Sequence, residues 1–356
     1  MPRRPTLGTV AEEAGVSIPT VSQVMRGTGR ISEVTRQKVL KAAKKLHYMP
    51  DLRAASIRSG ENNEIGFVIN QLQNPFNAEV VSGLVDRLED EGYLVSILDT
   101  RDDAARQSVH LQTFIRNGRG GLLWVPAFDT PRETFDLLRA HGIPTVTFLR
   151  RAGDDFDHVG IRNTEATARG TGYLADLGHR RIAYLGGREM STVRAERIEG
   201  YRRTLAARDL CAPVIWPCAD TKRAGMEALS ALRAAHPEIT AVVCNGDMVA
   251  LGACLSLQRA GLVPGRDVSV IGFDDIDDAA LATPALTTLA VSPRNLGRRL
   301  AQVRLERLRD PALPKSYTDV TAELIVRDTT GAPPGRDTTG APRGRDTTGA
   351  PRGRGL

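Results

Sequence analysis

The feature that most constrains the fold is a regular alternation of strand-like and helix-like segments between residues 61 and 326. Short apolar runs of strand length occur at 65–69, 94–98, 121–125, 145–149, 181–185, 241–244 and 268–272. Segments with helical periodicity follow them at 78–90, 106–117, 132–141, 165–177, 194–208, 222–235 and 249–260. Strands that alternate with helices form parallel sheets with helices on both faces. The stretch is too long for one small sheet, so we predict two α/β lobes.

Residues 1–60 have a different character, because they predict short helices and no strand. Thr6 can cap the first helix, Gly15 can end it in a left-handed conformation, and Ser17 can cap the second helix. Small and aliphatic side chains fall where the two helices would pack: Val10, Ala11, Ala14, Val21 and Val24. This spacing predicts a helix-turn-helix.

A third helix is expected from Ser32, its N-cap, to about Leu46. Its apolar face would hold Val34, Val39, Ala42, Ala43 and Leu46. Its other face is basic, with Arg36, Lys38, Lys41, Lys44 and Lys45. Residues 1–60 carry eleven Lys and Arg against four Asp and Glu, a balance of +7, whereas residues 61–326 carry −4. A basic head on an acidic body indicates that the head meets a polyanion such as DNA.

The segment 50–60 predicts a short, conditional helix. Pro50 breaks the third helix, Asp51 can cap a new one, and Gly60 ends it. A helix of about two turns is marginal alone in water, so this one would form only against its twin or on DNA. Two interpretations stay open for the apolar Ile57: an ordinary contact in an interdomain linker, or a wedge inserted at a minor-groove step.

The end of the chain repeats a nonapeptide three times, as RDTTGAPPG, RDTTGAPRG and RDTTGAPRG, from residue 327 to residue 353. The repeat contains no large apolar side chain, and Gly and Pro recur in every unit. Such a segment cannot bury enough apolar area to offset the entropy of ordering it. We therefore predict that residues 329–356 form a disordered tail.

Several other classes of protein find little support. The four cysteines, Cys211, Cys218, Cys244 and Cys254, form no Cys-x-x-Cys pair and no zinc spacing with His, which favours reduced thiols in a cytoplasmic protein. No dinucleotide fingerprint, Walker loop, His-Glu-x-x-His or Gly-x-Ser-x-Gly motif occurs. We expect no enzyme, no catalytic residue, no metal site and no cofactor.

Two alternatives remain to be tested. An enzyme of α/β fold is one, because the paired acids Asp274 and Asp275 are compatible with acid–base or metal chemistry. A solute-binding protein without a regulatory role is the other. It would need a signal peptide, and no apolar stretch follows the basic start at residues 1–5. No apolar run reaches the ~18 residues of a membrane span, and no membrane partner is expected.

The quoted residues also resemble a known family. The run Thr6-Leu7-x-x-Val10-Ala11-x-x-Ala14-Gly15-Val16-Ser17-x-x-Thr20-Val21-Ser22 and the run Tyr48-x-Pro50-Asp51-x-x-Ala54 are similar to the start of the lactose-repressor (LacI/GalR) family of bacterial transcription regulators. Motifs of the body agree in the same order: NPF at 74–76, GHRRIA at 178–183, RIEGY at 197–201, VSVIGFDD at 268–275 and LTTL at 286–289. Together they cover about residues 6–328.

The resemblance implies an all-α helix-turn-helix DNA-binding head plus an α/β periplasmic-binding-protein-like effector domain of two parallel-sheet lobes. The implied domains are a head at 1–49, a hinge helix at 50–60, a ligand-binding and dimerisation domain at 61–328, and a tail at 329–356. Within the domain the N-lobe would be about 61–161 and 291–322, and the C-lobe about 162–290 and 323–328. The implied function is ligand-responsive repression of a sugar or related carbon-source operon. The implied partners are a pseudo-palindromic double-stranded operator, a sugar effector and a second copy of the chain.

The resemblance also implies the residues of two sites. The expected DNA-binding residues are Thr6, Ser17, Ile18, Pro19, Thr20, Ser22, Gln23, Arg26, Arg53, Ala54 and Ile57. The expected effector-binding residues are Phe76, Arg197, Asn245 and Asp274. An Arg fork binds carboxylates or sugar hydroxyls, and Asp274 follows a predicted strand, where open α/β sheets bind ligands.

The chain departs from the family pattern at several of these positions. Ile18 and Pro19 occupy the two variable base-reading positions, and Gln23 stands where the family often has Arg. Gln pairs with adenine and Arg with guanine, so we expect a different base there. Ile57 replaces the usual Leu wedge. Leu149 stands where many sugar-binding members have Asp, which suggests an effector with fewer hydroxyls or another pose.

Overall fold

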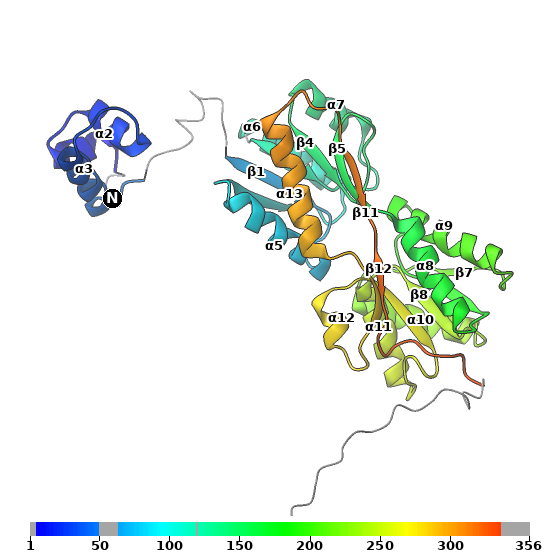
Figure 1. Ribbon diagram of the computed structural model, residues 1–356. Coiled ribbons are helices and arrows are strands. Elements are labelled where there is room, and N and C mark those ends of the chain that lie inside the picture. Colours follow the sequence, from blue (N-terminus) through cyan, green and yellow to red (C-terminus); the bar gives the residue numbers. More distant parts are fainter. Residues whose placement is uncertain (1–4, 50–62, 119, 336–356) are drawn as a thin grey trace, which may run out of the picture. The chain divides into compact units, whose positions relative to one another are not determined.

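The computed structural model describes residues 5–49, 63–118 and 120–335 (Figure 1). The chain divides into two compact units, residues 1–62 and residues 63–356, which we describe one at a time as the head and the body. The predicted hinge helix at 50–60 and the tail beyond residue 335 lie outside the described residues.

Three helices form the described head: α1 (Leu7–Ala14), α2 (Ile18–Arg26) and α3 (Glu33–Lys45). Each begins at a capping hydroxyl, because the side chains of Thr6, Ser17 and Ser32 accept a hydrogen bond from the backbone N–H three residues later. Gly15 and Gly27 end α1 and α2 at φ of 67° and 68°, a left-handed conformation that costs glycine little. The three predicted N-caps are therefore confirmed.

A small apolar core holds these helices together. Its buried side chains are Val10, Ala11, Val21, Val24, Val39, Ala42 and Ala43. Val34, which we predicted on the apolar face of α3, is instead 69% exposed. Val34 precedes Val39 by five residues, which turns it about 140° around the helix and away from the core. The prediction for Val34 is wrong.

The N-lobe of the body is built on a six-stranded parallel sheet of order β11-β5-β4-β3-β1-β2. Its strands are β1 (Glu64–Ile69), β2 (Leu94–Asp99), β3 (Gly121–Trp124), β4 (Thr145–Phe148), β5 (Asp157–Ile161) and β11 (Tyr317–Val320). Its helices are α5 (Pro75–Glu89), α6 (Ala104–Arg116), α7 (Arg132–Ala140) and α13 (Pro293–Arg309). Helices α5 and α13 lie side by side on one face (Figure 1). Gly83 and Gly297 permit this approach. A Cβ at Gly83 would lie 1.8 Å from the backbone oxygen of Arg294, and a Cβ at Gly297 would lie 2.0 Å from that of Val80.

The C-lobe is built on a second six-stranded sheet, of order β12-β10-β9-β8-β6-β7, in which only β12 is antiparallel among the described pairings. Its strands are β6 (Ile182–Leu185), β7 (Val214–Trp216), β8 (Ala241–Cys244), β9 (Ser269–Asp274), β10 (Thr287–Ala290) and β12 (Glu323–Ile325). Its helices are α8 (Asn163–Asp176), α9 (Thr192–Ala207), α10 (Lys222–Ala235), α11 (Asp247–Arg259) and α12 (Asp277–Leu281). The chain crosses between the sheets after β5, after β10 and after β11.

The first unit of the nonapeptide repeat corrects our prediction of a tail that is disordered from residue 329. Thr329 is fully buried, and residues 327–331 hydrogen-bond to the C-lobe. The prediction considered only apolar area, whereas this segment docks through backbone and hydroxyl hydrogen bonds. Residues 329–335 therefore belong to the body.

Candidate functional site

Most of the predicted DNA-binding residues lie on the outer side of α2 and at the start of α1. Thr6, Ser17, Ile18, Pro19 and Arg26 are exposed, whereas Thr20, Ser22 and Gln23 are half-buried. The side chain of Ile18 is 52% exposed, although it is apolar. The opposite side of α2 carries the core residues Val21 and Val24. The side of α2 opposite the core thus carries polar side chains together with the exposed Ile18 and Pro19.

Local hydrogen bonds order this surface. The hydroxyls of Ser17 and Thr20 lie 2.9 Å apart, and Nε of Arg26 donates to the backbone oxygen of Ser22 at 3.1 Å. Gln23 packs against Gly29, where a Cβ would lie 2.8 Å from its Oε1. Since a hydroxyl can donate and accept at once, the capping role of Ser17 leaves it able to bind a phosphate oxygen.

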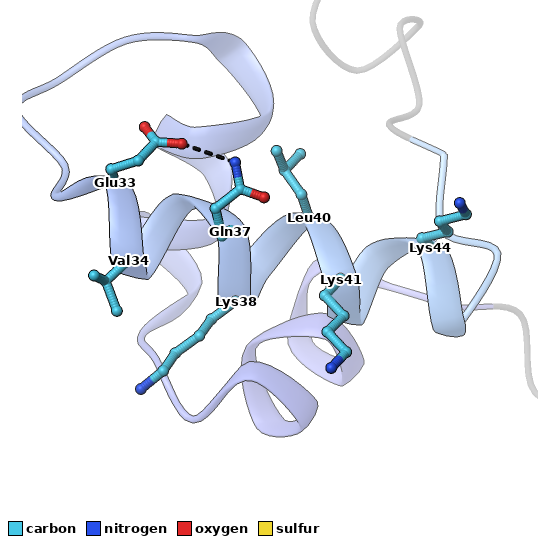
Figure 2. A pocket seen from close by; sticks show the side chains of 7 residues that line it. All are labelled: Glu33, Val34, Gln37, Lys38, Leu40, Lys41 and Lys44. Atoms are coloured by element: carbon cyan, nitrogen blue, oxygen red, sulfur yellow. Dashed lines mark hydrogen bonds between the residues drawn. The ribbon is translucent and has the colours of Figure 1, made fainter.

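The outer face of α3 is basic and partly apolar (Figure 2). A shallow hollow of about 730 Å³ is lined by Glu33, Val34, Gln37, Lys38, Leu40, Lys41 and Lys44. Nε2 of Gln37 donates to Oε1 of Glu33 at 2.8 Å across this face. Lys45 pairs with Glu13 of α1 at 2.7 Å, so it braces the helices together. The lysines supply the positive charge that the composition of the head predicts. The remaining predicted DNA-binding residues, Arg53, Ala54 and Ile57, lie outside the described residues.

In the body, Arg197 is the centre of a polar cluster. It lies in α9 and is 5% exposed. Its Nε donates to Oδ1 of Asn163 at 2.9 Å, and its Nη1 donates to the backbone oxygen of Asn245. The guanidinium carbon lies 3.5 Å from the ring centroid of Phe273. Among the described side chains no carboxylate forms an ion pair with Arg197, although its charge acts on the nearby Asp220 and Asp274.

Asn245, at the end of β8, links two neighbours of Arg197. Its Oδ1 accepts a hydrogen bond from the hydroxyl of Tyr184 at 2.7 Å, and its Nδ2 donates to Oδ1 of Asp220 at 2.7 Å. Burial raises the pKa of Asp220, while the bond from Asn245 and the charge of Arg197 oppose the shift. The amide of Asn245 is therefore fixed between a donor and an acceptor.

Asp274 ends β9 with φ of 117° and is 7% exposed. Burial raises the pKa of its carboxyl group well above the ordinary value, and the charge of Arg197 opposes this shift. A Cβ at Gly246 would lie 3.3 Å from Oδ2 of Asp274, so the missing side chain there gives the carboxylate room. Within the part of the chain that is described, no donor hydrogen-bonds this carboxylate.

The fourth predicted effector residue, Phe76, lies in the N-lobe, in the first turn of α5, and no hydrogen bond or ring contact joins it to the cluster within the described residues. Phe76 stacks parallel on Phe148 with 6.4 Å between the ring centroids. One turn further along α5, Oε1 of Glu79 accepts a hydrogen bond from the backbone N–H of Asp277 in α12 at 3.3 Å. This bond joins the two lobes close to the end of β9. The negative charge of Glu79 also raises the pKa of Asp274, so the two carboxylates lie near one another.

Sequence reasoning missed two further charged groups of this region. Arg150 follows β4, pairs with Asp102 at 2.5 and 2.8 Å, and lies over Phe128 at 3.8 Å. Its charge is one of those that oppose the rise in the pKa of Asp220, so Arg150 of the N-lobe lies within electrostatic reach of Asp220 in the C-lobe. Both follow the carboxyl end of a strand. Open α/β sheets bind ligands at the carboxyl ends of their strands, and this rule, which led us to Asp274, also points to Arg150. It would have led to Asp220 as well if β7 had been predicted.

The neighbouring acids, by contrast, have structural partners. Asp275 pairs with Arg327 at 2.7 Å, and Asp278 pairs with Lys222 at 2.5 Å. No group of three or more His, Cys, Asp and Glu side chains in the described ranges is arranged to hold a metal ion. No described helix is long and apolar enough to cross a membrane. A separate hollow of about 400 Å³ lies at the strands that cross between the lobes, and it includes Asn163 but none of the four predicted effector residues.

A helix-turn-helix head on a body of two parallel-sheet lobes, with buried polar groups gathered between the lobes, defines a ligand-responsive DNA-binding regulator. Comparisons with known proteins agree with this class. Residues 6–51 match the family described as "Bacterial regulatory proteins, lacI family", and residues 171–330 match the "Periplasmic binding protein-like domain".

Full-length relatives are similar over nearly the whole chain. The maltose regulon regulatory protein MalI of Escherichia coli (strain K12) is 32% identical over 85% of this chain and 92% of its own. The transcriptional repressor PurR of Vibrio campbellii (strain ATCC BAA-1116) is 32% identical over 91% of this chain and 98% of its own. The lac repressor dimer bound to operator and the anti-inducer ONPF has a TM-score of 0.81 at 26% identity, over 93% of this chain and 100% of that one. The complex of the regulator CelR with cellobiose has a TM-score of 0.70 at 27% identity, over 92% and 100%.

The chain belongs to the lacI family of bacterial regulatory proteins. It is a ligand-responsive, DNA-binding transcriptional repressor with a periplasmic-binding-protein-like effector domain. Because the members of this family regulate transcription and are not enzymes, the enzyme alternative is excluded.

Proposed function

We propose that this repressor controls genes for the uptake or catabolism of a sugar or related carbon source, with the sugar as its effector. It would act in the cytoplasm as a homodimer on a pseudo-palindromic operator. The observation that carries the proposal is the buried cluster of Arg197, Asn245 and Asp274 in the C-lobe, which Glu79 of the N-lobe approaches.

The chemistry of this cluster fits a polyhydroxylated ligand. Sugar hydroxyls both donate and accept hydrogen bonds, so they match a site that mixes the donor Arg197 with the acceptor Asp274. Asp274 has no hydrogen-bond donor among the described residues, and a hydroxyl would supply one. The ring of Phe76 would pack against apolar C–H groups. Relatives named for the maltose regulon and solved with cellobiose support the same class.

The head would bind the operator through α2 and the hinge. Ser17, Thr20 and Ser22 would contact phosphates, and Gln23 would read a base edge. Effector contacts to both lobes would favour one arrangement of the lobes and so change how two hinge helices pair on DNA. A coupling of ~1–3 kcal/mol between the sites is enough for a switch.

The test begins with a thermal-shift screen of sugars and nucleosides against the full chain, followed by calorimetry with each ligand found. Arg197→Ala and Asp274→Ala should each weaken binding roughly 10-fold or more, because each removes a hydrogen bond to a charged group. Arg203→Ala is the matched control, since Arg203 lies in the same helix but is exposed and pairs with Glu199 at 2.6 Å. Unchanged affinity in both site variants would remove them from the effector site. A response to nucleosides alone would replace the sugar as effector.

A further inference from the structure

The first repeat unit occupies a built site on the C-lobe, across the amino ends of β9 and β10. The backbone oxygen of Thr329 accepts a hydrogen bond from the N–H of Val270 at 2.8 Å. Its hydroxyl accepts from the N–H of Thr287 at 2.9 Å and donates to the backbone oxygen of Val270 at 2.8 Å. Thr329 thus satisfies three backbone groups of the sheet and is fully buried.

The flanking residues are bound as specifically. Gly331 donates from its N–H to Oγ of Ser269 at 3.0 Å, and its oxygen lies 2.9 Å from Nε2 of His179. A Cβ at position 331 would lie 2.5 Å from the backbone oxygen of Gly265, so only glycine fits without a shift. Thr330 shares hydroxyl contacts with Tyr173 at 3.2 Å and with Thr287 at 3.0 Å.

The first two residues of the unit complete the site. Nη1 of Arg327 donates to the backbone oxygen of Leu286 at 2.8 Å, and Arg327 also pairs with Asp275. Asp328 donates from its N–H to Ala285 at 2.9 Å and accepts the N–H of Ala285 on Oδ2 at 3.2 Å. The side chains of Arg327, Asp328, Thr329 and Thr330 therefore all contact the C-lobe, and Gly331 is held through its backbone.

The same five residues return at 336–340 and at 345–349. The three nonapeptides differ only at their eighth position, which is Pro334, Arg343 or Arg352. No hydrogen bond or ion pair within the described chain involves residues 332–335, so that difference does not touch the contacts that hold the unit. The second and third units therefore contain the same five residues that contact the C-lobe in the first unit.

We propose that this surface of the C-lobe is a peptide-binding site for the sequence RDTTG, and that residues 336–340 of the same chain are its second ligand. When the first unit is displaced, the second takes its place and nine residues loop out between β12 and the site. The entropy of closing a loop grows only slowly with its length, so a loop of this size opposes the exchange weakly. The first unit is favoured while it is intact, because it needs no loop.

The test compares two lengths of chain, the full chain and a chain that ends at Gly335, each with and without Thr329→Asp. A carboxylate cannot enter this fully buried position without a cation, so the variant expels the first unit. In the shortened chain the melting temperature should fall by on the order of 5 °C or more. In the full chain it should fall by less than half as much, because residues 336–340 dock instead. Thr329→Ser keeps the hydroxyl and should change little in either length.

Two further measurements keep the proposal open to refutation. The peptide RDTTGAPRG, added to the shortened Thr329→Asp variant, should raise its melting temperature, whereas RDAAGAPRG should not. If that variant does not fold, Thr329→Val takes its place, with amide exchange at Val270 as the readout. Equal losses in the two lengths, or no response to the peptide, would overturn the proposal. A rescue that grows with protein concentration would overturn the assignment to the same chain, because it would indicate a second copy.

Discussion

Single buried side chains set the local electrostatics of the C-lobe, and Asp247 at the start of α11 is the clearest case. It is fully buried, its Oδ1 accepts from the hydroxyl of Thr288 at 2.6 Å, and its Oδ2 accepts from the N–H of Ile276 at 3.0 Å. Burial nevertheless raises its pKa to about 7, with the nearby charge of Asp275 adding to the shift. The folded protein therefore holds a proton on Asp247 that the unfolded chain releases at lower pH.

This shift gives a signed pH dependence. Because its folded-state pKa exceeds that of the unfolded chain, the contribution of Asp247 to stability is fully present at low pH and is lost as pH rises through about 4 to 7. Asp247→Asn cannot titrate, so it should remove part of this fall, even though its amide suits the N–H of Ile276 less well. Urea unfolding of both proteins across that range measures the two slopes. Parallel slopes would mean that Asp247 does not take up the proton.

Gln23 carries the prediction about base reading. Its side chain lies on the outer part of α2 near Gly29, away from the core residues Val21 and Val24. If it reads a base edge, Gln23→Ala should weaken binding to the selected operator by ~1–3 kcal/mol and barely change binding to random duplex DNA. Fluorescence anisotropy on both duplexes provides the comparison. Equal losses on the two would make Gln23 a backbone contact.

At the scale of elements, the described head is fixed by local signals. Hydroxyl side chains begin its three helices at the predicted residues, and Gly15 ends α1 as predicted. The hinge helix at 50–60 lies outside the described residues and stays a prediction. Because Pro50 and Gly60 would limit it to about two turns, we expect it to form only against a partner, and so to respond to DNA.

The hinge prediction follows from that dependence. Ala54→Gly and Ser56→Gly should each cost about 1 kcal/mol of helix or less. Operator binding should weaken accordingly, while effector affinity measured by calorimetry on the full chain stays the same. Amide exchange should show residues 51–59 protected on the operator and unprotected in the free protein. Protection without DNA would reduce the hinge to a tether.

The sequence predicts strong, periodic elements well and weak ones poorly. The helix at 222–235 and the strand at 241–244 have the predicted bounds, since their apolar pattern is unambiguous. Strands β7 and β12 have three residues each, too few to show a period, and β5 contains Asp157 and His158. They were missed because tertiary packing, and not local pattern, makes them strands. Helix α13 was missed too, although Leu296 and Leu300 face its core.

The residues of the candidate site likewise divide into those that the sequence predicted and those that it missed. The family resemblance drew attention to Arg197 and Asp274, and the structure brings them together in one cluster. Asp220 was out of reach, because β7 before it was not predicted. Thr329 was missed for a different reason: hydrogen bonds, which composition does not reveal, hold it in the C-lobe.

At the scale of the whole molecule, the chain joins a basic head to a body of two lobes. Each lobe is built from segments that are separated in the sequence. The chain crosses between the sheets after β5, after β10 and after β11, so the proposed ligand between the lobes would act on the lobe arrangement itself. The head carries the positive charge that attracts DNA, and the body carries the buried polar cluster. Regulation requires that these two parts be coupled, and reciprocity then requires DNA to change effector affinity by the same factor.

The most direct test is an operator titration with and without effector. The full chain selects its operator from random duplexes, and fluorescence anisotropy measures the Kd at zero and at saturating effector. We predict a change in Kd of about 5–150-fold. Arg197→Ala should retain the Kd measured without effector and lose the change. The same Kd with and without an effector that calorimetry shows to be bound would contradict the account.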